Sequence, residues 1–433
     1  MKTDAEKEKK TDGEQETEDK KKVIRTAQID QIKEFVMGAY SFRFNVITQT
    51  LEYREHMDIG YRQFNDRVKT DIVIQLKQQM MKKPKEDLED LFNSSMIPDF
   101  DPIKEYFEQI PYRGDGNIDK LCSCIILEDQ ESEIAGFQYK VLFRAYFEKW
   151  LTACYLCSTG KIVNDVMLIL IGAQGRFKTS FLNFLTPKGL VDYRVCGHIN
   201  PSLTDYNTSN YLAEKFFVNV DDQMENIFGK DYNSMKSIIS APDITNRKLY
   251  RASHQRRRRI ANFCGSVNES RFLRDSNNRR YLCFAITDIK PEYIQIDMDA
   301  VWAEVKHNAD KTGTTYIFGK EDYKMIDLMN ASFEAPTEEA EALTTIFKPA
   351  DGSPGHVYLM QFGEILQVLK DRTRNTQMRS YNLQTAMRKY NYKPQSVKQS
   401  RFGNTPRYLY AVQLVDPADT TLTDKLYHFI KNV

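Results

Sequence analysis

Hydrophobic and polar positions follow three different patterns along the chain. Residues 1–24 consist almost entirely of Lys, Glu, Asp, Thr and Gln, so they cannot bury a core and we expect a disordered charged tail. Residues 25–135 have mostly helical apolar spacing and predict a mainly helical N-terminal accessory region, with a β-like piece at FRFNVITQTLEYRE. In PDFDPIKEYFEQI, Asp101 is expected to cap a helix with Pro102 in its first turn. A metal-binding Asp99 and Asp101 pair is the alternative.

The middle of the chain alternates between strand-like and helical patterns. Apolar residues at helical spacing from about Gly136 to Cys157 predict a long amphipathic helix. The strand-like runs VMLILI, FFVNV, IANFCGSVN and RYLCFAI then alternate with helical stretches, which predicts an α/β core over residues 136–290. Residues 291–340 predict a helical segment and an acidic linker. Residues 341–433 predict two helices and a hairpin, the order of a winged-helix-like domain.

Composition, net charge and cysteine content exclude several classes of protein. The 433 residues are 41% hydrophobic, enough for several cores, and the net charge of +1 restricts nucleic-acid contact to local basic patches. No stretch of the sequence approaches the roughly 20 consecutive apolar residues that a membrane helix needs. The charged N-terminal residues also show no apolar segment of a signal peptide. Seven cysteines without disulfide-scaffold density fit a cytoplasmic protein. Cys154 and Cys157 fall on the predicted long helix, so we expect them to face a core, with a zinc site as the alternative.

The candidate chemistry begins in the stretch VMLILIGAQGRFKTSFLNFL, where an apolar strand runs into a glycine-rich turn and a helix. This context predicts a phosphate-binding loop of a P-loop NTPase; a core strand followed by a surface turn is the alternative. Gly172 and Gly175 would shape the turn, and Lys178 would bridge the phosphates. Thr179 would bind Mg²⁺, and the helix that begins near Ser180 would direct its N-terminus at the anion. Phe177 stands where such loops usually have glycine.

Two later segments supply the partners that such a loop needs. EKFFVNVDDQMEN ends an apolar strand in Asp221 and Asp222, which predicts that Asp221 holds Mg²⁺ through water and Asp222 orients the attacking water. Helix capping by these acids is the alternative. The strand in IANFCGSVN ends at Asn268, which we expect near the γ-phosphate. Arg279 or Arg280 would reach a neighbouring subunit's nucleotide as an arginine finger, with plain surface charge as the alternative.

These three elements and their flanks resemble the virulence-associated E family of P-loop ATPases, found on phages, plasmids and mobile elements and related to superfamily three helicases of the AAA+ class. The resemblance extends from about Phe42 to Asp288. It rests on GAQGRFKTS at the family's Walker A position and on MKSIISAPDITNRKLYRASHQRRRRIANFCGSVNESRFLRDSNNRRY, with its Arg247-x-x-Tyr250 step, Asn268 and the Asn-Arg-Arg signature. Phe177 for Gly and Asp222 for Glu depart from the family pattern.

Basic residues cluster in two places. The resemblance implies that the interval between the second and third motifs forms a hairpin that grips DNA phosphates in a ring channel; a solvated or subunit-contact face is the alternative. Its basic residues are Arg247, Lys248, Arg251, Arg256, Arg257, Arg258 and Arg259. In the C-terminal region, Arg388 on the second helix and Arg401 near the hairpin tip are expected to contact nucleic acid. Protein interaction is the alternative role of that domain.

Together these features predict an ATPase with ATP and Mg²⁺ as cofactors. The preferred function is a ring-forming, helicase-like motor that acts on single-stranded or forked DNA in replication of a mobile element or phage, with replication proteins as further partners. The alternative is a DNA-binding initiator or scaffold with weak or no hydrolysis, motivated by Phe177 and Asp222. A small-substrate kinase is a third, weaker option, because kinases rarely need so much arginine between their motifs.

Overall fold

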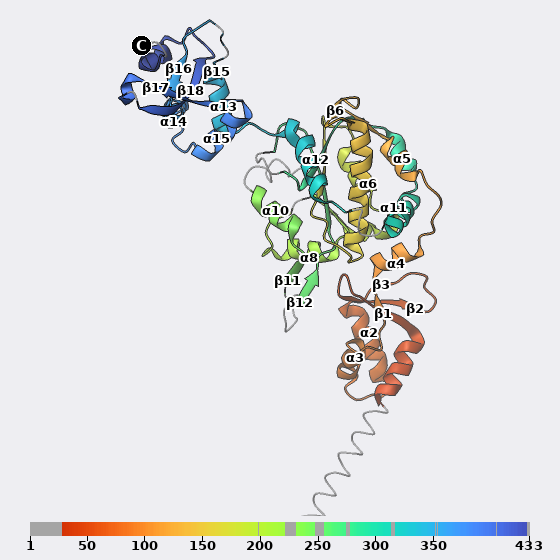
Figure 1. Cartoon of the computed structure of the whole chain (residues 1–433). Coiled ribbons are helices and arrows are strands. Elements are labelled where there is room, and N and C mark those ends of the chain that lie inside the picture. The colour runs from red at the N-terminus through yellow and green to blue at the C-terminus, as the bar shows by residue number, and fades with distance from the viewer. Residues whose placement is uncertain are drawn as a thin grey trace, which may run out of the picture. The chain divides into compact units, whose positions relative to one another are not determined.

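A computed structural model describes residues 28–197, 199–220, 231–246, 255–273, 278–312, 317–350, 352, 354–403 and 405–430 (Figure 1). The chain divides into two compact units. The first contains Met1–Val267 and Phe284–Asp322, and the second contains Asn268–Cys283 and Tyr323–Val433. None of the described helices combines the length and apolar character that crossing a membrane requires.

The first unit begins with a small α/β region. Residues 28–39 are helical, and β1 (Tyr40–Asn45) and β2 (Thr50–Glu55) form an antiparallel hairpin, which confirms the predicted β piece. With β3 (Arg62–Gln63) and β4 (Asp99–Phe100) they make a four-stranded sheet of order β3-β2-β1-β4. Helices α2 (Asp66–Gln78) and α3 (Pro84–Phe92) complete a core around Phe42, Ile72 and Leu88.

Two short helices lead from this region to the central sheet. Helix α4 (Pro102–Gln109) begins as predicted, because the Asp101 carboxylate accepts hydrogen bonds from the backbone N–H of Ile103 at 3.1 Å and of Lys104 at 3.0 Å. Helix α5 (Asn117–Cys122) follows, and then β5 (Ile125–Leu127), β6 (Glu133–Ile134) and β7 (Phe137–Gln138). The buried Glu304 carboxylate accepts from the first N–H groups of α5, which fixes the start of that helix.

A six-stranded sheet of order β5-β14-β8-β13-β10-β9 forms the centre of the fold. Its further strands are β8 (Met167–Ile171), β9 (Arg194–Cys196), β10 (Phe217–Asn219), β13 (Asn262–Val267) and β14 (Tyr281–Ile289). The neighbours β8–β13, β13–β10 and β10–β9 are parallel, whereas β5 pairs antiparallel with β14. Every residue of β8 is buried, as a continuous apolar run in a parallel sheet requires.

Helices pack around this sheet. They are α6 (Tyr139–Ser158), α7 (Lys178–Phe184), α8 (Tyr206–Glu214), α10 (Tyr232–Ser240) and α11 (Met298–Thr312), with short 3₁₀ turns η1 (Lys188–Tyr193) and η2 (Pro291–Gln295). The predicted long helix is α6; its Trp150 stacks on Phe217 of β10 at 5.7 Å between ring centroids. Cys154 and Cys157 are buried on α6, as expected for core residues. Strands β11 (Asp243–Asn246) and β12 (Gln255–Arg258) form a separate hairpin.

The second unit contains the C-terminal domain. Helix α12 (Lys320–Asn330) and η4 (Ala331–Phe333) precede α13 (Glu338–Ile346), β15 (Phe347–Pro349), β16 (Tyr358–Met360), α14 (Phe362–Thr373) and α15 (Ser380–Lys389). Then come β17 (Pro394–Lys398), η5 (Ser400–Phe402), β18 (Pro406–Leu414), α16 (Thr420–Leu426) and η6 (Tyr427–Phe429). The predicted order of helix, helix and hairpin is confirmed as α14, α15 and β17–β18, around a core that includes Leu343, Leu383 and Val412.

Candidate functional site

The glycine-rich turn joins β8 to α7 at the carboxyl edge of the parallel sheet. Gly172 follows β8 directly and donates its N–H to the Val267 carbonyl of β13 at 3.1 Å. A Cβ at residue 172 would lie 2.5 Å from the carbonyl oxygen of Ile286, closer than any side chain tolerates. Glycine at 172 therefore lets the turn leave the sheet between its neighbouring strands.

Lys178 is held by the turn that precedes it. Its side chain is 6% exposed, and Nζ donates to the carbonyl oxygens of Gly172 at 2.6 Å and Ala173 at 2.7 Å. Because these carbonyls lie five and six residues before the lysine, the turn curls round its ammonium group. The ammonium group thus lies among the backbone carbonyls of the turn, and its phosphate-binding role stays a prediction.

Phe177 occupies the position where the sequence departs from the glycine usual in such loops. Its φ of 58° lies in the left-handed region, as does the φ of 81° of Gly175 two residues earlier. Glycine adopts this conformation without penalty, whereas a residue with a Cβ is strained by roughly 1–2 kcal/mol. The ring is 48% exposed, so the chain accommodates phenylalanine by turning its side chain partly to solvent.

The first turn of α7 carries the two predicted hydroxyl residues. Thr179 is half-buried, whereas Ser180 is exposed. The Ser180 side chain hydrogen-bonds the Tyr293 phenol; burial raises the pKa of Tyr293, and the bond with Ser180 opposes that rise. Beside them, the loop residue Arg176 pairs with Asp288 at 3.5 Å. The Ser180 hydroxyl therefore has a partner within the protein, and the Mg²⁺-binding role of Thr179 stays a prediction.

The predicted acidic strand is β10, two places from β8 in the sheet. Its end lies beside α7, because the Asn219 amide donates to the Asn183 side chain at 3.1 Å, and Asn183 is about one helical turn beyond Thr179. Val220 continues the ladder by donating to the Cys264 carbonyl at 3.0 Å. Asp221 and Asp222 come next in the chain but lie outside the described residues, so their metal and water roles stay predictions.

The predicted sensor and finger residues belong to the second unit. Asn268 is exposed and follows Val267, the last residue of β13. Arg279 is exposed, with its guanidinium 5.2 Å from the centroid of the Tyr323 ring, whereas Arg280 is half-buried. Sequence reasoning missed what fixes this turn: the Asn330 amide donates to the carbonyls of Asn278 at 3.2 Å and Tyr281 at 2.7 Å. No motif marks Asn330, which lies about 50 residues away.

The predicted DNA-binding hairpin is present as β11 and β12, with Thr245 opposite Arg256 and Ile244 opposite Arg257. The residues that connect the two strands, 247–254, lie outside the described part of the chain; they include Arg247, Lys248 and Arg251. In the described part, strand alternation divides the basic run into two sets. Arg256 and Arg258 are exposed, whereas Arg257 and Arg259 are buried.

The structure corrects the nucleic-acid prediction for the buried pair. Arg257 forms an ion pair with Glu214 at 2.9 Å and also donates to the Ile47 carbonyl. Arg259 has no exposed surface, and its guanidinium donates to the backbone carbonyls of Ala261 at 3.0 Å, Asn164 at 2.6 Å and Ile239. Burial lowers the pKa of the Arg259 side chain. These two arginines anchor the hairpin to the core and do not face a ligand.

In the C-terminal domain, Arg401 is partly exposed and has partners within the protein, and its nucleic-acid contact stays a prediction. Arg401 pairs with Glu364 at 2.7 Å and donates to the Leu359 carbonyl at 2.7 Å, so its guanidinium joins η5 to α14 and β16. Arg388 is exposed on α15, as the prediction requires. The sequence reading missed two exposed tyrosines, Tyr381 at 74% and Tyr408 at 75% exposure, on α15 and β18. Of the two, Tyr408 directly follows the exposed Arg407 in the chain.

These features define an α/β protein in which a glycine-containing loop at the carboxyl edge of a parallel sheet binds the ammonium group of Lys178. The same protein has a basic hairpin that is anchored to the core by buried arginines. The chain belongs to the virulence-associated protein E-like family, whose domain matches residues 112–335, slightly more than half of the chain. This match confirms the family that the sequence motifs predicted.

None of the curated proteins matches the chain. Among solved structures, the chain is similar to an A-form apo structure of the NrS-1 C-terminal region, at 13% identity and a TM-score of 0.45, and to a second A-form structure at 12% and 0.46. A further apo structure of that region gives 13% and 0.46. Each similarity covers 88% of this chain and 98% of the other.

Proposed function

We propose that this protein is an ATP-dependent, ring-forming DNA helicase or translocase that acts in replication of a mobile genetic element or phage. The observation that carries the proposal is the loop between β8 and α7, whose carbonyls hold the Lys178 ammonium at the N-terminus of α7. A glycine turn, a restrained lysine and a helix N-terminus are the parts that bind a triphosphate.

The sheet order supports an AAA+-like core, as the family resemblance implied. Strand β13 lies between β8 and β10, so the loop strand and the acidic strand are separated by the strand that runs into Asn268. In this proposal Lys178 binds the phosphates of ATP, while Thr179 and Asp221 hold Mg²⁺. Asp222 orients the attacking water and Asn268 senses the γ-phosphate. Arg279 or Arg280 completes the site of a neighbouring subunit.

DNA would be bound by the exposed basic residues alone. On the hairpin these are Arg256 and Arg258, and in the C-terminal domain the contact is Arg388. Arg247, Lys248 and Arg251, which lie outside the described residues, stay predicted DNA contacts. The anchoring Arg257 ties β12 to α8 through Glu214, so the hairpin moves with the core that binds nucleotide. Such a rigid attachment is what a motor needs to convert nucleotide state into displacement of DNA.

The test is ATP turnover with and without single-stranded DNA, in wild type and in Lys178→Ala. We expect wild-type turnover to rise with DNA and the variant to lose it, because the lysine neutralises the phosphates in the transition state. Lys188→Ala, an exposed lysine on η1, is the matched control and should retain activity. Turnover that is unchanged in Lys178→Ala would remove the loop from the mechanism. Negative-stain images with ATP and DNA test for a closed ring.

The strained backbone of Phe177 favours one second candidate, a DNA-binding initiator or scaffold that hydrolyses little ATP. A motor must couple its two ligands, so a non-hydrolysable ATP analogue should change its DNA affinity by a measurable factor. A scaffold should bind DNA equally well with and without the analogue. Titration of fluorescent DNA in both conditions distinguishes the two functions.

A further inference from the structure

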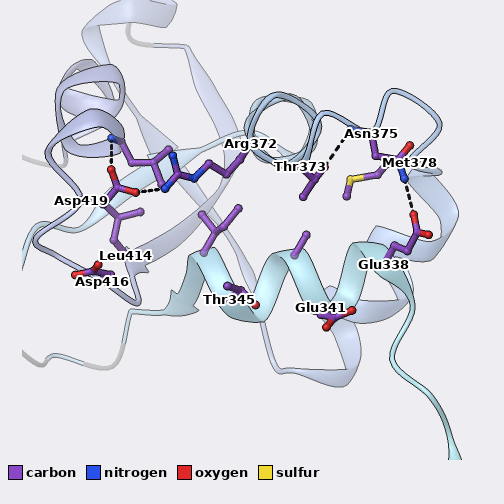
Figure 2. A pocket seen from close by; sticks show the side chains of 13 residues that line it. Glu338, Glu341, Thr345, Arg372, Thr373, Asn375, Met378, Leu414, Asp416 and Asp419 are labelled. Atoms are coloured by element: carbon purple, nitrogen blue, oxygen red, sulfur yellow. Dashed lines mark hydrogen bonds and ion pairs between the residues drawn. The ribbon is translucent and has the colours of Figure 1, made fainter.

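The C-terminal domain contains a groove that the proposed motor function does not use. Its volume is about 640 Å³, within the range of ligand and peptide pockets. Helix α13 forms one wall, and the end of α14 with the segment that follows it forms the other, closed by the stretch from Leu414 to Leu422 (Figure 2). Among the described residues that line it, none comes from α15 or β17.

The floor of the groove is apolar and continuous with the core of the domain. Ala342 and Ile346 contribute from α13, one helical turn apart, and Met378, Leu414 and Leu422 contribute from the opposite side. All five belong to the hydrophobic core of this domain, yet they border the groove. An apolar side chain that entered here would be removed from water against these residues.

The rim of the groove is acidic. Figure 2 shows Asp416 and Asp419 at one end, Glu338 at the other, and Glu341 along α13 between them. Among the described residues that line the groove, Arg372 is the one cation, and it pairs with Asp419 at 2.6 Å. The Asn375 amide donates to Glu338, and the Ala418 N–H donates to Asp416 at 3.0 Å, so these two rim carboxylates are held in place. An excess of carboxylates repels nucleic acid and attracts cations.

The opposite chemistry is found on α15 and the β17–β18 hairpin, where Arg388, Lys398 and Arg407 are exposed. The domain thus has a basic surface suited to DNA and a separate groove with the reverse charge. We propose that this groove docks a peptide segment of a partner protein, in which one or two large apolar residues are flanked by Lys or Arg. Apolar anchors in a pocket would supply affinity, and the acidic rim would select basic flanks. The inference does not rest on ATP hydrolysis.

The experiment selects ligands from a phage-displayed random peptide library on the immobilised full-length protein. We expect enriched peptides that place a Leu, Ile, Met or aromatic residue between basic residues. A fluorescein-labelled copy of the enriched peptide then gives the Kd by anisotropy. Glu341→Lys, which reverses an exposed charge on the rim, should weaken binding at least about tenfold, and Thr345→Trp should weaken it similarly by filling the groove. Asp371→Lys, an equal charge reversal on α14 outside the groove, is the matched control and should bind as wild type.

Three results would overturn the inference: no enrichment above that on Glu341→Lys protein, enrichment of acidic peptides, or equal loss in Asp371→Lys and Glu341→Lys. Displacement of the peptide by DNA would also contradict it, because the groove would then be part of the nucleic-acid surface. DNA-stimulated ATP turnover of Glu341→Lys should match wild type. This readout separates the two ideas: failure of the groove leaves the Lys178 test intact, and failure of the ATPase leaves peptide docking intact.

Discussion

Arg256 and Arg259 stand three residues apart in one basic run, but the structure gives them opposite roles. The Arg256 side chain is 76% exposed and pairs with Asp243 at the surface, whereas Arg259 is fully buried among backbone carbonyls. We therefore predict that Arg259→Met destabilises the fold without changing DNA contacts. Arg256→Met should do the reverse.

The magnitude follows from the contacts. The Arg259 guanidinium donates to the carbonyls of Ala261, Asn164 and Ile239, and each hydrogen bond from a charged group contributes roughly 1.5–3 kcal/mol. Removing the cation also relieves its desolvation, which is worth several kcal/mol. The expected net loss is about 3 kcal/mol, or several degrees in the midpoint of thermal unfolding. The exposed pair of Arg256 contributes at most about 1 kcal/mol.

The assay has two readouts, thermal unfolding and anisotropy of labelled single-stranded DNA at several salt concentrations. Loss of one phosphate contact lowers the slope of log affinity against log salt by about 0.7 for a single strand. We expect this decrease in Arg256→Met only. Two results would refute the assignment of Arg259 as an anchor. One is an Arg259→Met protein with the melting temperature of wild type, and the other is an Arg259→Met protein whose salt slope of DNA affinity falls as it does in Arg256→Met.

Three further predictions follow from the loop and the buried thiols. Gly172→Ala should lower the free energy of unfolding by roughly 1–3 kcal/mol and weaken ATP binding, because its Cβ meets the Ile286 carbonyl. Gly363→Ala is the control: its Cβ meets open space, so its melting temperature should equal that of wild type or lie slightly higher. Phe177→Gly should keep both stability and nucleotide affinity, since a φ of 58° suits glycine. Phe177→Val should be less stable in urea unfolding, because a β-branched residue is strained at this φ. Equal stability of the two variants would argue against a left-handed backbone at residue 177. Native protein at pH 8 should be alkylated by iodoacetamide at the exposed Cys196 first. Burial raises the pKa of Cys122 to about 12, so almost no thiolate is present; peptide mapping that finds Cys122 modified as fast as Cys196 would contradict its burial.

Local patterns in the sequence were sufficient for much of the fold. The continuous apolar run at 167–171, the glycine turn and the following helix were all predictable, because a buried parallel strand and a helix each impose a short period on their own residues. The cap at Asp101 was equally local, since a carboxylate and the N–H groups it accepts lie within three residues. The family, too, followed from motifs in the sequence alone.

Other features required contacts between residues distant in the chain. The order of β8, β13 and β10 arises from pairing between segments about 50–100 residues apart, which no local period encodes. The basic run shows the same limit: its charges were evident, but pairing of β12 with β11 decided which arginines face solvent and which enter the core. The acidic groove likewise exists only because α13 lies against elements more than 25 residues further along the chain. Sequence by itself determined the local elements and their chemistry, whereas tertiary packing decided which side chains remain accessible to a ligand.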